Sequence, residues 1–142
     1  MITNVLLDLD GTLTDPALGI TNCIAYALTR LGAAVPVANE LHFAIGPPLR
    51  GTFATLLATS DVALIERAMV FYRERFSDIG LFENSVYEGV PEMLATLKAR
   101  NFRLLLATAK PHVYARRILA RFGIHASFDA VYGSELDGVR QH

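Results

Sequence analysis

The sequence has little with which to build a disulfide, a sulfur-based metal centre or a membrane span. Cys23 is the only cysteine, so no internal disulfide can form and no thiolate cluster is present for zinc. No apolar run reaches the roughly 20 residues needed to cross a bilayer, and no basic segment followed by a long apolar one begins the chain. We therefore expect a cytoplasmic protein that is neither exported nor inserted in a membrane.

The chain also lacks an excess of positive charge. Its 13 Lys and Arg residues nearly balance 14 Asp and Glu residues, and they form no basic stripe. Nucleic acid is therefore not an expected partner, whereas small anions remain candidate ligands. With 142 residues, of which 52% are hydrophobic, the chain can bury a core of ordinary domain size.

The order of the apolar patterns predicts an α/β fold. The short apolar run Val5–Leu9 is typical of a parallel strand that is buried on both faces. The segments "FRLLLATAK" and "FDAVYGS" predict two further strands, and predicted helices near Pro91–Arg100 and Val113–Phe122 precede them. This alternation implies parallel pairing with right-handed crossovers, and hence a Rossmann-like sheet.

Residues 16–86 show a different pattern, because only helices are predicted there. Apolar residues recur at three- and four-residue spacing from Ala17 to Leu31, and further helices are predicted from Pro47-Pro48 to about Ala58 and from Val62 to about Ile79. We therefore divide the chain into an α/β core of residues 1–15 and 87–142 and an inserted helical module of residues 16–86.

Polar residues follow each predicted strand. Asp8, Asp10, Thr108 and Ser134 fall at carboxyl ends of strands, where open parallel sheets bind their ligands. Asp8 and Asp10 leave the same face of an extended segment, so they repel each other unless a cation or a shared proton intervenes. Mg²⁺ suits such a pair, and one carboxylate can attack phosphorus while the other moves protons. A simple strand end followed by an Asp-Gly turn is the alternative.

Two of these segments resemble signature motifs of one superfamily. "DLDGTLTD" resembles the first motif, and "LLLATAKP" the second motif, of the haloacid dehalogenase-like superfamily, whose members are mostly magnesium-dependent phosphatases. The resemblance implies that Asp8 is the nucleophile and Asp10 the general acid and base. It also implies that Thr108 holds the transferring phosphoryl group, and that the Asp8 carboxylate and the Asp10 backbone carbonyl bind Mg²⁺.

Four further residues complete the phosphate site that we expect. These are Gly11, Thr12, Ala109 and Lys110. Gly11 permits a sharp turn, and the Thr12 hydroxyl adds a donor. Lys110 is a point charge for a bound phosphate, although a surface lysine at a helix start is the alternative that its position favours.

The helical module extends the resemblance. "AIGPPLRGTF" and "YRERFSDIGLFENSVYEGV" are similar to stretches of the phosphoglycolate phosphatase and 5'-nucleotidase-like subgroup, in which a helical cap closes over the site. This similarity implies hydrolysis of a small phosphorylated metabolite through an aspartyl-phosphate intermediate. Gly46 and Pro47 belong to a rigid loop that suits close approach to a ligand. Arg50 either meets a second anionic group on the substrate or is a solvated side chain.

Two parts of the family pattern are not found in this sequence. They are the third-motif lysine and the fourth-motif acids that complete the magnesium site. The first strand, central in the family, becomes an edge here, and an unpaired apolar edge favours association. The alternative function is therefore a catalytically incomplete fragment or a non-catalytic interaction module, stabilised by self-association or by a partner chain.

Overall fold

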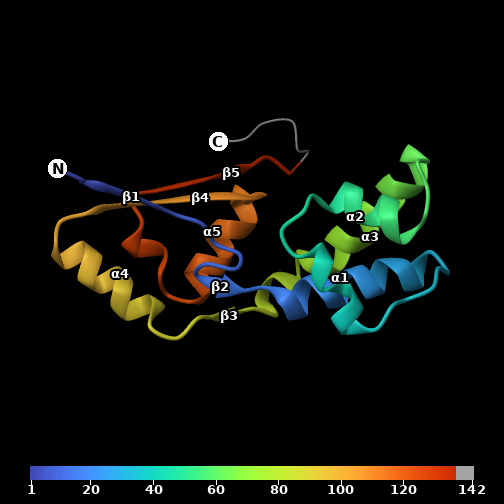
Figure 1. Cartoon of the computed structure of the whole chain (residues 1–142), viewed down its shortest axis with the longest axis horizontal. Helices are drawn as coiled ribbons and strands as arrows, with labels where there is room; N and C mark the ends of the chain where they lie inside the picture. Colours follow the sequence, from blue (N-terminus) through green and yellow to red (C-terminus); the bar gives the residue numbers. More distant parts are fainter. Residues whose placement is uncertain (137–142) are drawn as a thin grey trace. The chain divides into compact units, whose positions relative to one another are not determined.

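The computed structural model describes residues 1–136, which form two compact units (Figure 1). The first unit contains Met1–Asp15 and the chain from Ser85 onward, and the second unit is Pro16–Asn84. The chain therefore passes between the units after Asp15 and after Asn84. The sequence-based division placed the second passage after residue 86, two residues later.

A parallel three-stranded sheet organises the first unit, in the order β1–β4–β5. Its strands are β1 (Asn4–Leu7), β4 (Arg103–Pro111) and β5 (Ala130–Ser134), and its helices are α4 (Val90–Ala99) and α5 (His112–Arg121). The 3₁₀ helix η3 (His125–Ser127) precedes β5. The predicted Rossmann-like α/β fold is thus confirmed, and β1 is an edge strand among the described residues.

Among residues 1–136, helices cover one face of this sheet and leave the other open. α4 and α5 lie on the same side of the strands, as Figure 1 shows, which is the arrangement expected of right-handed crossovers that run in the same direction along the sheet. Leu104 and Leu106 are fully buried on that face, whereas Leu6 is 65% and Tyr132 45% exposed on the other. The prediction that the first strand is buried on both faces is therefore wrong, because an apolar run does not reveal how many faces are covered.

A second, two-stranded sheet lies where the chain leaves and re-enters the first unit. β2 (Thr14–Asp15) pairs antiparallel with β3 (Ser85–Val86), and the Tyr87 N–H donates to the Leu13 carbonyl at 3.0 Å. Each strand has two residues, which is too short to produce a periodic pattern in the sequence. This ladder was therefore not predicted.

The second unit is helical, as its periodicity predicts. It contains α1 (Ala17–Arg30), α2 (Leu49–Leu56) and α3 (Val62–Phe76), with the 3₁₀ helices η1 (Ala38–Ala44) and η2 (Gly80–Phe82). α1 packs along α3, and the Asp61 carboxylate caps α3 by accepting a hydrogen bond from the Ala63 N–H at 3.0 Å.

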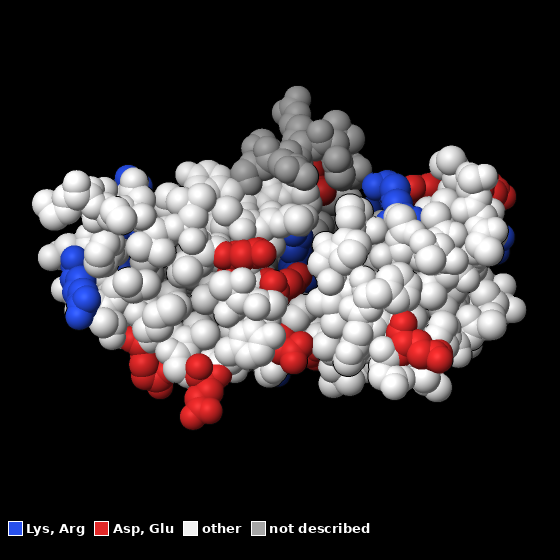
Figure 2. Space-filling view, viewed as in Figure 1, with Lys and Arg blue, Asp and Glu red and all other residues white. Residues whose placement is uncertain are grey.

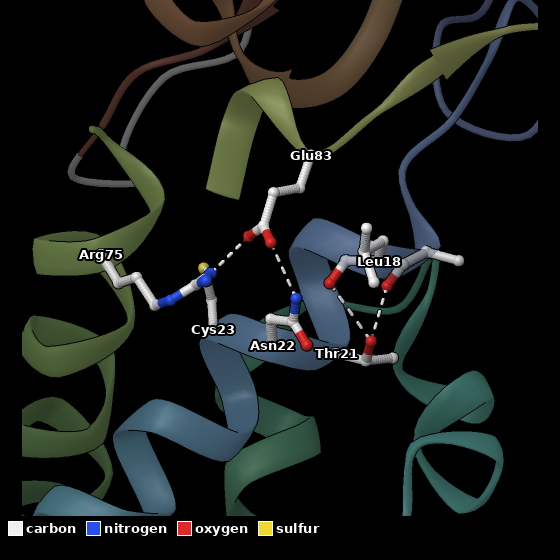
Figure 3. A network of polar contacts seen from close by, with 7 residues as sticks. Leu18, Thr21, Asn22, Cys23, Arg75 and Glu83 are labelled. Carbon is white, nitrogen blue, oxygen red and sulfur yellow. Dashed lines mark hydrogen bonds and ion pairs between the residues drawn. The ribbon is translucent and has the colours of Figure 1, made fainter. Parts of the chain in front are cut away.

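A polar network ties α1 to α3 and to the segment after η2 (Figure 3). Glu83 accepts hydrogen bonds from the Arg75 guanidinium and, at 2.8 Å, from Asn22 Nδ2. Arg75 also donates to the buried thiol of Cys23, with 3.4 Å between nitrogen and Sγ. The hydrogen bond from Arg75 holds the pKa of Glu83 below its usual value. The network joins the two ends of this unit to each other.

Charged side chains are dispersed over the surface shown in Figure 2. Lys and Arg form separate small groups there, with no continuous basic area on that face. Within residues 1–136, no helix is both long and apolar enough to cross a bilayer.

Candidate active site

The first-motif segment makes a tight turn directly after β1. Leu9 is fully buried, and its carbonyl oxygen accepts hydrogen bonds from the N–H groups of Thr12, Leu13 and Thr14 at 2.9 to 3.2 Å. Gly11 has φ 78°, a left-handed conformation that glycine adopts without steric cost. The buried leucine therefore anchors a turn that holds an aspartate on each side of it.

The carboxyl ends of β1 and β4 lie side by side. Leu7 is paired with Leu106 in the parallel register, so Asp8 follows the last rung by one residue and Thr108 follows it by two. The Asp8 carboxylate is exposed and accepts a hydrogen bond from the Leu9 N–H at 2.7 Å. A nucleophile candidate and a phosphate-binding candidate thus occupy the same edge of the sheet.

Lys110 reaches from the end of β4 to the first-motif turn. Its Nζ lies 3.1 Å from Oδ2 of Asp10, and the two side chains are only 7% and 21% exposed. β4 continues to Pro111, so Lys110 belongs to the strand rather than to the start of α5. The interpretation as a surface lysine is therefore wrong: this lysine is a buried cation beside the candidate general acid and base.

The other carboxylate oxygen of Asp10, Oδ1, lacks a hydrogen-bond donor among the described residues. Oδ1 is buried and accepts no hydrogen bond from the described residues. Such an atom is costly to bury unless a proton, a cation or a ligand satisfies it. A proton, a cation or a hydrogen-bond donor of a ligand would therefore be favourable at Oδ1 of Asp10.

The donor set fits Mg²⁺. This ion commonly takes one or two protein carboxylates and completes its shell with water and phosphate oxygens, so Asp8 and Asp10 are sufficient protein ligands. No group of three or more metal-ligating His, Cys, Asp or Glu side chains occurs in residues 1–136. At a site of this composition, water or substrate oxygens would fill the remaining positions around the ion.

The other phosphate candidates lie in the exposed backbone around this edge. Gly11, Thr12 and Ala109 are exposed. The Ala109 carbonyl accepts a hydrogen bond from Ser134 Oγ at 3.0 Å. Sequence reasoning placed Ser134 at the end of a predicted strand without assigning it a role, and it did not include Gly133 among the candidate residues. The only sequence feature that could have pointed to these two residues was their position as a Gly-Ser pair at the end of the third predicted strand.

The cap candidates belong to the second unit. Gly46 has φ 107°, and both Gly46 and Pro47 are exposed in the loop before α2. Arg50 Nε lies 2.6 Å from an oxygen of Glu66 on α3, and this hydrogen bond lowers the pKa of Glu66. Arg50 is therefore half exposed but ion-paired, a state that neither alternative for this residue included.

Fold and site together define a class of protein. A Rossmann-like sheet carries paired aspartates after its first strand and a threonine after the neighbouring strand, and a helical unit is inserted between them. The model of the family "Haloacid dehalogenase-like hydrolase" matches residues 5–138. The chain belongs to this family, and the resemblance of its two motifs is thus confirmed.

Curated relatives are similar along nearly the whole chain. The chain is 48% identical over 139 residues to a 5'-nucleotidase from Pseudomonas aeruginosa, with 98% of this chain and 62% of that protein covered. It is 40% identical over 136 residues to the tyrosine-protein kinase PtkA of Mycobacterium tuberculosis, with 96% and 46% covered. A phosphoglycolate phosphatase from Colwellia psychrerythraea is 28% identical over 138 residues, with 92% and 61% covered.

A solved structure shows the same fold. The crystal structure of a predicted phosphatase from Clostridium acetobutylicum has a TM-score of 0.91 and 40% sequence identity to this chain. The match covers 99% of this chain and 65% of that one. The chain thus spans less than two thirds of each of these four proteins.

Proposed function

We propose that the protein is a magnesium-dependent phosphatase that hydrolyses a small phosphate monoester, of the phosphoglycolate or nucleoside monophosphate type, through an aspartyl-phosphate. The observation that carries the proposal is the edge where β1 and β4 end, with Asp8, Asp10, Thr108 and the buried Lys110. The names of the relatives, 5'-nucleotidase and phosphoglycolate phosphatase, support the substrate class.

In the first step, a carboxylate oxygen of Asp8 attacks phosphorus and the bond from phosphorus to the leaving oxygen breaks. For this step Asp10 must be protonated, and it donates that proton to the leaving oxygen. The Thr108 side-chain oxygen, Oγ1, accepts a hydrogen bond from the backbone N–H of Lys110 at 3.1 Å. The hydroxyl hydrogen of Thr108 can then be donated to a phosphoryl oxygen. The Lys110 ammonium adds a positive charge beside the same group.

In the second step, the ionised Asp10 takes a proton from a water molecule whose oxygen attacks phosphorus. The bond between phosphorus and the Asp8 oxygen breaks, inorganic phosphate leaves and the Asp8 carboxylate is regenerated. When bound by Asp8 and the Asp10 backbone carbonyl, Mg²⁺ supplies charge neutralisation for the phosphoryl oxygens.

We assign recognition of the leaving group to the cap loop that contains Gly46, Pro47 and Arg50. Since Arg50 is paired with Glu66, a second anionic group on a substrate must compete with that carboxylate for the guanidinium. The single cysteine, Cys23, is buried and suits a reducing cytoplasm, where we expect the protein to act.

Turnover of an aryl phosphate with and without Mg²⁺ tests the proposal. We expect magnesium-dependent hydrolysis that Asp8→Asn abolishes, because the amide cannot form the acyl phosphate. Asp78→Asn, an exposed substitution in the second unit, is the matched control and keeps full activity. Equal turnover by Asp8→Asn and the unmodified protein would refute the proposed nucleophile.

A second candidate is a non-catalytic interaction module of the same fold. The sequence left this candidate open, because the third-motif lysine and the fourth-motif acids of the family were not found in it. This candidate predicts no magnesium-dependent turnover by the unmodified protein, whereas the phosphatase predicts turnover. An intact mass of the purified material is needed alongside, so that activity is attributed to a chain of known length.

A further inference from the structure

The pairing between β4 and β5 is irregular at the candidate phosphate site. Ala107 is opposite Tyr132, and the next rung pairs Pro111 with Ser134. Three residues of β4, Thr108 to Lys110, therefore stand opposite Gly133 alone. Such a bulge bends the strand and redirects its side chains. The bulged residues are the second-motif candidates for binding phosphate.

Gly133 permits β5 to approach this bulge closely. A Cβ atom at this position would lie 2.5 Å from the Lys110 carbonyl oxygen and 2.8 Å from the His112 nitrogen. Both are backbone atoms, so the clash cannot be relieved by rotating a side chain. Any larger residue at position 133 must push the bulge away from β5.

Ser134 fixes the middle of the bulge. Its side chain is buried, and its hydroxyl donates to the Ala109 carbonyl at 3.0 Å. The next N–H group, that of Lys110, donates to Thr108 Oγ1. The hydrogen bond from Ser134 thus orients the peptide group between Ala109 and Lys110. The same peptide group holds the Thr108 hydroxyl and sets the direction of the Lys110 side chain.

This arrangement extends over three strands. β5 holds the bulge of β4, and the bulge directs Lys110 to within 3.1 Å of Asp10 beyond β1. Lys110 is nearly buried there, so small displacements of its backbone change the position of its ammonium group. A residue of β5 can therefore act on a ligand that it does not touch.

We propose that Gly133 and Ser134 are positioning residues that shape the Thr108–Lys110 bulge to bind the oxygens of a phosphoryl group. This inference rests on the proposed function, because it assumes that the bulge receives phosphate. It adds the third strand to the site and predicts that phosphate affinity depends on a serine outside both motifs.

Binding of inorganic phosphate, measured by calorimetry in the presence of Mg²⁺, tests the proposal without requiring turnover. We expect Ser134→Ala to weaken binding about fivefold, since one neutral hydrogen bond is removed. Ser134→Thr keeps the hydroxyl and restores most of the affinity. Ser127→Ala, in η3 of the same unit, is the matched control and binds as the unmodified protein does.

The same variants separate positioning from simple stabilisation. Ser134→Ala should raise KM for an aryl phosphate more than Ser127→Ala does when the two variants are compared at temperatures well below their unfolding transitions. Gly133→Ala should weaken phosphate binding more than Ser134→Ala, because backbone atoms must move. If Gly133→Ala does not fold, the pair Ser134→Ala and Ser134→Thr decides the question.

Two failures are distinguishable. Equal phosphate affinity of the unmodified protein and Ser134→Ala would overturn the positioning role and leave the proposed function intact. No binding of phosphate by the unmodified, folded protein would overturn the proposed function and this inference together.

Discussion

Lys110 Nζ lies 3.1 Å from Asp10 Oδ2, and the lysine side chain is 93% shielded from solvent. The two residues come from different strand ends, so the contact joins β4 to the turn after β1. When one partner of a shielded pair is removed, the other charge remains in a poorly solvated place. We therefore expect that removing the charge of either residue destabilises this edge of the sheet.

Lys110→Met tests this link. We expect the free energy of unfolding to fall by about 1–3 kcal/mol, because the Asp10 carboxylate keeps its burial and loses its cation. Phosphate affinity should fall by about tenfold, since a charged donor is removed. Denaturant unfolding and phosphate titration measure the two effects.

Lys98→Met is the control for this substitution. Lys98 pairs with Asp129 at 3.4 Å, but the two side chains are 39% and 32% exposed. Water screens the charges of such an exposed pair, so this variant should lose little stability and no phosphate affinity. Equal losses in both variants would contradict a special role for Lys110.

The sequence was sufficient to predict the alternation of strands and helices and the position of Asp8 and Asp10 at a strand end. It was not sufficient for Lys110, because the burial of this lysine depends on a bulge set by Gly133 and Ser134, more than 20 residues away. The exposure of Leu6 was likewise unpredictable, since the run of apolar residues Val5–Leu7 does not show which face of the strand is covered. Non-local packing decides both features.

Glu83→Gln probes the network at the ends of the second unit. Glu83 accepts hydrogen bonds from Arg75 and Asn22 and is 22% exposed, so the variant should lose about 1–2 kcal/mol at neutral pH. The pKa of Glu83 is lowered in the folded state, chiefly by Arg75. Its contribution is therefore fully present above the unfolded-state value of about 4.3 and is lost as the pH falls through the lower folded-state value.

The free energies of unfolding of the Glu83→Gln protein and the unmodified protein should therefore begin to converge as the pH falls below the unfolded-state pKa of about 4.3, and should meet below the lowered folded-state pKa of Glu83. Glu66→Gln removes an exposed partner of Arg50 and should have a smaller effect at neutral pH. A difference between Glu83→Gln and the unmodified protein that stays constant from pH 7 to acid would show that the Glu83 charge is not responsible.

Gly19→Ala and Gly80→Ala test the close approach of α1 to η2. A Cβ atom on Gly19 would lie 2.0 Å from the Gly80 carbonyl oxygen, and one on Gly80 would lie 2.3 Å from Cys23 Sγ. Both variants should be destabilised by about 1–3 kcal/mol through overpacking, with Gly19→Ala the worse because it meets backbone. Thermal unfolding measures the effect.

Gly51→Ala is the matched control for these two substitutions. Gly51 lies inside α2, and apart from its chain neighbours and the backbone of its own helix no described heavy atom lies within 4 Å of a Cβ built on it. Because glycine is a poor residue for a helix interior, alanine should stabilise the protein by about 0.5–1 kcal/mol. A loss of stability in Gly51→Ala as large as that in Gly19→Ala would mean that contact at α1 and η2 is not the cause.

The uncovered face of the core sheet predicts self-association. In the described residues, β1 is an edge strand and Leu6 at its middle is 65% exposed, so its free backbone groups and its apolar side chain are both available to a second copy. Sedimentation velocity should show association that increases with protein concentration.

Leu6→Lys should shift the protein toward monomer without lowering its melting temperature, since the leucine contributes little to the core. Val62→Lys, an equally exposed site at the start of α3, should leave association unchanged. A protein that stays monomeric at all concentrations, or that associates equally well with lysine at position 6, would show that this edge is not a contact surface.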